Sequence, residues 1–191
     1  SYFEAVEAVC ESMKVLGDEY VSVLRQGLTT GRWVDVYESR GKRSGAYSSG
    51  CYDSPPYILM NFKEESLNDV FTLAHEAGHS MHSYFSRNHQ PYCDSDYTIF
   101  VAEVASTFNE QFLTKYLRTN FKSDRKLQAY LVNQQIDDIK ATLFRQTMFA
   151  EFEREIHEKI CKNEPVTLET LRTIYSTLLT KYFGHEVTVS E

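Results

Sequence analysis

The sequence is poor in features that would place it among secreted or membrane proteins. It has four cysteines, and no two of them form a Cys-x-x-Cys pair. We therefore expect no thiolate metal site, and thiols this sparse favour a reducing cytoplasm over a disulfide framework. No apolar run approaches the roughly 20 residues that a transmembrane helix needs, and the first residues lack the regions of a signal peptide. The expected location is cytoplasmic, without a membrane partner.

Positive charge is also scarce. Lys and Arg number 20 against 27 Asp and Glu, which gives a formal net charge of -7. Such a chain offers no broad cationic surface, so a nucleic-acid partner is not expected. Hydrophobic residues at 42% and charged residues at 25% are typical of a folded domain. The chain opens without Met inside an expected helix, so we interpret residues 1–191 as one domain cut from a larger helical protein, whose remainder packs against it.

Hydrophobic spacing predicts a mainly α-helical fold with one small β-sheet, of the α+β class. Spacings of three and four predict a helix over residues 2–16, and a second one, capped by Asp18, to about residue 28. Glycine-rich turns and short apolar runs predict three strands within about 33–60.

Helices are predicted from residue 66 onward. The active-site helix is expected over about 66–86, starting at Ser66 with a capping pattern. A third-ligand helix is expected over about 98–117, and C-terminal helices over about 124–184, the first of them to about residue 160. Thr167 is the expected cap of the last helix.

The motif His-Glu-x-x-His lies in the middle of the predicted helix over 66–86. His75 and His79 are four residues apart, so both imidazoles lie on one helix face and can bind one zinc ion at about 2.0–2.1 Å. Glu76 points about 100° away from His75 and can reach a water held by the metal. Because zinc lowers the pKa of that water toward about 7, Glu76 is the expected general base for hydrolysis.

A catalytic zinc needs a third protein ligand, and two residues of the next helix are candidates. Glu103 is favoured, because its neighbours are apolar and a carboxylate there would be costly to bury unless paired or bound to metal. Glu110 lies two turns further on the same face; it is the rival ligand, or it orients a ligating histidine. His82 either supports the site in the same way or is simply a partly exposed histidine.

These segments resemble the thimet-oligopeptidase family of zinc metallopeptidases, peptidase family M3, and in particular its bacterial oligoendopeptidase F branch. The matching segments are residues 33–38, 41–47, 56–62, 71–83 and 100–110. The resemblance implies a zincin-like catalytic core, with one Zn²⁺ per chain, that cuts short oligopeptides in a deep, mostly helical channel. It assigns His75, His79 and Glu103 to the metal and Glu76 to the base. It also implies that the strand at Gly45 and Ala46 borders the cleft and can pair with an extended substrate.

Two departures from that family affect the expected activity. Its members are several hundred residues longer, and they carry a loop rich in His and Tyr that binds the oxyanion. This chain is expected to stop, at residues 184–191, just before that loop. Since loss of an oxyanion donor costs about 10²–10³ in rate, we expect these 191 residues alone to be weakly active or inactive.

Three hypotheses follow for the function. The first is a zinc-dependent endopeptidase core. The second is a truncated or non-catalytic zinc-binding domain, and the third is a helical interaction module with an accidental motif. Metal analysis and peptide hydrolysis with and without a chelator distinguish them.

Overall fold

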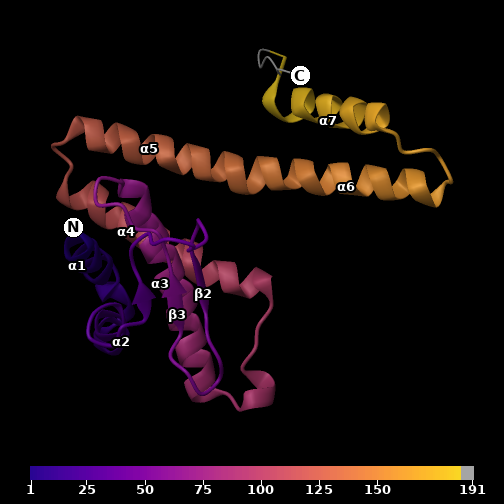
Figure 1. Ribbon diagram of the computed structural model, residues 1–191. Helices are drawn as coiled ribbons and strands as arrows, with labels where there is room; N and C mark the ends of the chain where they lie inside the picture. Colours follow the sequence, from indigo (N-terminus) through magenta and orange to yellow (C-terminus); the bar gives the residue numbers. More distant parts are fainter. Residues whose placement is uncertain (186–191) are drawn as a thin grey trace. The chain divides into compact units, whose positions relative to one another are not determined.

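The computed structural model describes residues 1–185, which fall into two compact units (Figure 1). The first unit is Ser1–Ser123 and the second begins at Asp124. The fold is mainly helical with one small three-stranded sheet, as the sequence predicts. No helix among residues 1–185 is long and apolar enough to cross a membrane, and all four cysteines are free thiols. The prediction made for residues 186–191 lies outside the described residues.

The first unit opens with α1 (Tyr2–Ser12), the 3₁₀ turn η1 (Lys14–Leu16) and α2 (Asp18–Leu28). The first predicted helix therefore ends as an α-helix four residues early, and η1 supplies its last turn. Gly17 stops it with a φ of 99°, which only glycine adopts readily. The expectation that Asp18 caps α2 is wrong, because Gly17 takes the cap position and Asp18 is the first helical residue.

The sheet consists of β1 (Val34–Asp35), β2 (Tyr47–Ser49) and β3 (Tyr57–Leu59), in the order β1-β3-β2. The central strand β3 is parallel to β1 and antiparallel to β2. All three strands are shorter than the apolar runs that predicted them. Two prolines before Tyr57 have no N–H for the ladder, so β3 begins only after them. Ile58 of β3 is buried, and the sheet thus closes one side of the core.

The two longest helices of the first unit are α3 (Leu67–His89) and α4 (Ile99–Asn120), joined through the 3₁₀ turn η2 (Tyr92–Asp94). They pack against each other, and the buried face of α3 fills the centre of the unit. Both helices run about three residues past their predicted ends. Ser66 is the N-cap of α3, but its hydroxyl oxygen accepts no hydrogen bond from a backbone N–H of the helix and the hydroxyl instead donates to Asp69 Oδ1 (3.0 Å).

The second unit contains α5 (Arg125–Ile139), the π-helical segment η3 (Lys140–Arg145), α6 (Gln146–Cys161) and α7 (Leu168–Phe183). The predicted helix from residue 123 to 160 is thus present with a π-helical segment in its middle. Met148 of α6 packs with Ile174 and Leu178 of α7 in a small core. Thr167 caps α7 as predicted, because its side chain accepts from the Thr170 N–H at 3.2 Å.

Candidate metal centre

Helix α3 presents two imidazoles to one point. His75 and His79 are one helical turn apart, and their Nε2 atoms lie 3.1 Å from each other. Between and beside them Leu73, Ala74 and Ala77 are completely buried, which fixes the rotation of the helix. The histidine side chains consequently lie at the margin of the core, 25% and 17% exposed. The local prediction from the four-residue spacing agrees with this geometry.

Helix α4 brings Glu103 to the same point. One carboxylate oxygen of Glu103 lies 3.4 Å from His75 Nε2 and the other lies 3.6 Å from His79 Nε2. The buried Asn109 holds α4 here, because its amide nitrogen donates to Ala74 O (3.4 Å) and contacts the Tyr20 hydroxyl (3.1 Å). Glu103, 43% exposed, leaves one side of the cluster open to solvent.

The donor set and its spacing fit a zinc ion. Two imidazole nitrogens and one carboxylate are a known ligand set of catalytic zinc, which keeps its fourth position open. Two atoms that each lie about 2.0–2.1 Å from a tetrahedral zinc are separated by about 3.3 Å. The separations of 3.1, 3.4 and 3.6 Å between the three groups lie around that value. Among residues 1–185, these three side chains form the single group of this kind with ligand atoms all within 4.8 Å.

Glu110 contacts the outer nitrogen of His75. Its Oε1 is hydrogen-bonded to His75 Nδ1. With a carboxylate as acceptor, Nδ1 carries the proton and Nε2 is left free to bind metal. Burial lowers the pKa of His75, but the hydrogen bond and charge of Glu110, with the charges of Glu76 and Glu103, outweigh it and the pKa stands above its ordinary value. Burial and the charge of His75 lower the pKa of His79.

Glu76 lies beside the three-residue group without belonging to it. Its side chain is buried, with 7% exposure, and its Oε2 has no hydrogen-bond partner among the described residues. Burial raises the pKa of this carboxyl group, against the opposing effects of His75 and of a backbone hydrogen bond from Ser48. A buried carboxylate with a raised pKa is a better proton acceptor near neutral pH than a solvated one.

Strand β2 is an outer strand of the sheet and contacts α3 (Figure 1). Ser48 of β2 is tied to α3 by a hydrogen bond between its hydroxyl and that of Ser80, at 2.8 Å. The predicted cleft residues Gly45 and Ala46 come directly before the strand. Asn61 donates to the carbonyl of Gly45 (2.9 Å), and Gly45 itself is exposed with a φ of 93°.

His82 is placed differently from the ligands. Its ring stacks on Tyr97 with centroids 3.8 Å apart, and its Nδ1 is buried and has no hydrogen-bond partner within residues 1–185. Tyr97 also shares a 2.5 Å hydrogen bond with Ser83. No hydrogen bond between His82 and the three-residue group occurs in the described part of the chain. The stack ties the connection between α3 and α4 back onto α3.

Sequence reasoning missed three residues that hold the two helices together at the site. These are Gly78, Ser106 and Asn109, all buried where α3 meets α4. Gly78 had a usable signal, because a glycine inside a helix costs about 1 kcal/mol relative to alanine and often marks a close approach. Ser106 and Asn109 carry no such signal, since their roles depend on the helix crossing.

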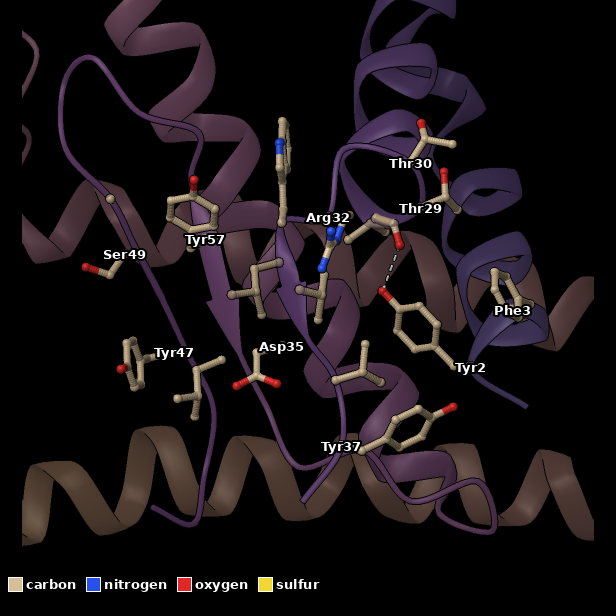
Figure 2. A pocket seen from close by; sticks show the side chains of 17 residues that line it. Tyr2, Phe3, Thr29, Thr30, Arg32, Asp35, Tyr37, Tyr47, Ser49 and Tyr57 are labelled. Carbon is tan, nitrogen blue, oxygen red and sulfur yellow. Dashed lines mark hydrogen bonds between the residues drawn. The ribbon is translucent and has the colours of Figure 1, made fainter. Parts of the chain in front are cut away.

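A pocket lies away from the histidine and glutamate side chains described above. It has a volume of about 990 Å³ and opens between the N-terminal helices and the sheet (Figure 2). Tyr2 crosses its margin and donates from its hydroxyl to Leu28 O at 3.0 Å. Tyr37, Tyr47 and Tyr57 also line the pocket (Figure 2). None of the clustered histidine and glutamate side chains borders this pocket, so its size does not make it the chemical centre.

Comparison with known proteins places this geometry in a family. The sequence model described as Peptidase family M3 matches residues 5–191. The chain is 54% identical over 191 residues to an oligoendopeptidase F homolog of Borreliella burgdorferi, covering all of this chain and 32% of that protein. It is 50% identical over 191 residues to oligopeptidase PepF of Bacillus subtilis, covering all of this chain and 28% of that protein. The chain thus spans about a third of the length of these relatives.

Solved structures agree on the fold. A crystal structure of a Chlamydophila abortus protein superimposes with a TM-score of 0.80 at 48% identity, over all of this chain and 32% of that one. A structure from Bacillus anthracis superimposes with a TM-score of 0.72 at 21% identity, over 94% of this chain and 32% of that one. At that lower identity the likeness concerns the fold alone.

Proposed function

The chain belongs to peptidase family M3, and on that premise we propose that it is the catalytic core of a zinc-dependent endopeptidase that hydrolyses short oligopeptides. The observation that carries the proposal is the meeting of His75, His79 and Glu103 within 4.8 Å. These three side chains hold one Zn²⁺ per chain. When bound, zinc polarises a carbonyl oxygen and lowers the pKa of water toward about 7.

Glu76 is the general base in this proposal. Its carboxylate takes the proton from the attacking water and later passes it to the leaving amine nitrogen. Burial supports this role, because it raises the pKa of Glu76, and no donor among residues 1–185 occupies Oε2, which is therefore free to accept a proton. Glu110 keeps His75 in the tautomer whose Nε2 faces the metal.

The substrate lies along β2 as an extended peptide. β2 has β3 on one side and is the outer strand of the sheet, so its other edge can pair with a peptide backbone. Ser48 ties this edge to α3 one residue away from His79, through Ser80. Gly45 and Ala46 extend the edge with little side-chain bulk, which permits close approach of the substrate.

The remainder of the longer protein packs against α4. This helix exposes large apolar side chains: Ile99 is 73% exposed and Phe100 is 83% exposed. Val104 and Phe108 continue the same exposed stretch, at 58% and 56%. Apolar groups of this size are rarely left together in water, and the relatives are about three times as long as this chain.

Substitution of Glu76 by Gln tests the reaction. In the full-length protein we expect hydrolysis of a quenched-fluorescent peptide to fall by about 10²–10⁴, the typical contribution of a general base. Metal analysis should still give one zinc per chain, because Glu76 is outside the ligand group. The control is Glu7→Gln, which removes a carboxylate that contacts Arg25 at the surface.

Three results would contradict the proposal. Full turnover by Glu76→Gln excludes its role as base. A wild-type protein without stoichiometric zinc after reconstitution excludes the metal centre. If zinc binds but a chelator-sensitive hydrolysis is never seen, the non-catalytic zinc-binding alternative replaces the enzyme.

A further inference from the structure

Helices α3 and α4 approach each other at backbone distance, and Gly78 makes this possible. A Cβ atom built on Gly78 would lie 2.7 Å from Ser106 Cα and 2.8 Å from Ala105 O. Both contacts are with the backbone of α4, which cannot rotate away as a side chain can. Any residue other than glycine at this position would therefore push α4 away from α3.

The contact lies within one helical turn of all three ligand positions. Gly78 is directly before His79 and three residues after His75, while Ser106 follows Glu103 by three residues. A shift of α4 at this contact consequently moves Glu103 relative to the two imidazoles. When a catalytic group is misplaced by about 1 Å, the reaction rate can fall by about 10²-fold.

Ser106 also contacts the third ligand directly. Its side chain is completely buried, and its hydroxyl donates to Glu103 Oε2 at 2.8 Å. The same oxygen, Oε2, is the one that lies 3.4 Å from His75 Nε2. The hydroxyl therefore selects the rotamer in which the carboxylate faces the histidines, although Glu103 is 43% exposed and otherwise free to turn toward solvent.

We propose that Gly78 and Ser106 are positioning residues of the metal centre, which set the distance and the orientation of Glu103 relative to His75 and His79. Gly78 fixes how closely α4 lies on α3. Ser106, seated against Gly78, aims the Glu103 carboxylate. The inference rests on the proposed zinc site and adds to it the two residues that bring its third ligand into place.

The test uses the variants Gly78→Ala and Ser106→Ala in the full-length protein, with zinc affinity measured by competition with a chromogenic chelator. Loss of a group that orients a metal ligand typically weakens metal binding by about 10–100-fold, and we expect that range for each variant. The visible absorption of the Co²⁺-loaded protein is the second measurement. It reports the number and arrangement of ligands, and we expect it to change in both variants.

Matched controls separate positioning from general destabilisation. Gly27→Ala also creates an overlap at a buried helix glycine, because a Cβ at Gly27 would lie 2.3 Å from the Trp33 ring, but this overlap is with a side chain and lies on α2, not between α3 and α4. Ser12→Ala removes a buried serine hydroxyl that donates to Val9 O at 2.7 Å, inside α1. Both controls should lower the unfolding temperature and leave zinc affinity and the Co²⁺ spectrum unchanged.

The outcomes distinguish this inference from the function on which it rests. Absence of zinc from the wild-type protein overturns the metal centre itself. If the wild-type protein binds zinc and Ser106→Ala binds it with the same affinity, the inference is overturned. If Gly78→Ala does not fold, Ser106→Ala decides alone. If Gly78→Ala and Gly27→Ala have the same Co²⁺ spectrum and the same zinc affinity, the proposed role of the close approach between α3 and α4 is overturned.

Discussion

Removal of the Glu110 carboxylate should weaken zinc binding although Glu110 lies outside the proposed ligand group. In the described structure its Oε1 is hydrogen-bonded to His75 Nδ1. Two substitutions separate the contribution of the charge from that of the hydrogen bond. Glu110→Gln keeps an acceptor and removes the charge, whereas Glu110→Ala removes both.

The burial of His75 and Glu110 determines how much zinc affinity we expect to be lost. The side chains of His75 and Glu110 are 25% and 20% exposed, so solvent screens the contact only in part. A hydrogen bond to a charged group contributes about 1.5–3 kcal/mol, and each 1.4 kcal/mol is a tenfold change in affinity. We therefore expect zinc to bind about 10–100-fold more weakly to Glu110→Ala. For Glu110→Gln we expect about 5-fold, because a neutral hydrogen bond remains.

Protonation opposes this effect at low pH. Glu110 helps to hold the pKa of His75 above its ordinary value, so its removal also weakens the competition of protons with the metal. Chelator competition should for that reason be measured at about pH 8.5, about two units above the ordinary histidine pKa of about 6.5.

A carboxylate of similar burial in the second unit provides the control. Glu151, 17% exposed, contacts the Lys181 amine and the Tyr182 hydroxyl at 2.7–2.8 Å, and Glu151→Gln should leave zinc affinity unchanged. Wild-type affinity in Glu110→Ala would refute the reasoning, as would a Glu110→Gln variant weaker than Glu110→Ala.

Three further predictions concern stability and reactivity. Cys10 is completely buried and burial raises the pKa of its thiol to about 11, so mass spectrometry after alkylation at pH 8 should find the three exposed cysteines modified and Cys10 only after denaturation. Leu73→Ala should lower the free energy of unfolding by about 2–5 kcal/mol in a denaturant titration, because Leu73 is completely buried in α3; a loss under 1 kcal/mol would contradict this packing. Thr167→Ala should lower the free energy of unfolding by about 1 kcal/mol, because it removes the cap of α7. Thr167→Ser should keep most of that stability, because serine has the same hydroxyl.

The sequence was sufficient where structure depends on neighbours along the chain. The facing of His75 and His79 follows from helix periodicity alone, because the i and i+4 positions of any α-helix share a face. Thr167 was recognised as a cap for the same reason, since its acceptor role involves the N–H three residues later. The sequence predicts the three strands at the right places but too long, because the length of a strand depends on the strands it pairs with and not on its own residues alone.

The sequence was insufficient where structure depends on how α3 crosses α4. Glu103 and Glu110 lie seven residues apart on one helix face, so periodicity alone could not tell which of them meets the imidazoles. The crossing brings Glu103 to the Nε2 atoms and Glu110 to Nδ1 of His75. That assignment depends on where α4 crosses α3, and the close backbone contact at Gly78 lies at this crossing. A helix glycine signals such an approach but does not say which residue of the other helix it meets.

The interface between these two helices departs from the composition that packing alone would favour. A leucine-rich seam would stabilise two crossing helices, yet this one buries Ser106 and Asn109 and contains a glycine in mid-helix. The neighbouring face of α3, toward β2, buries Glu76 and Ser80. Buried polar groups and helix glycines each lower stability, and they persist where function requires them. Glu76 is the clearest case, because its Oε2 is buried with no hydrogen-bond partner in the described part of the chain, and a Leu or Gln at that position would be easier to bury. The arrangement is therefore better explained by the placement of the proposed base and the three proposed metal ligands than by the needs of the fold.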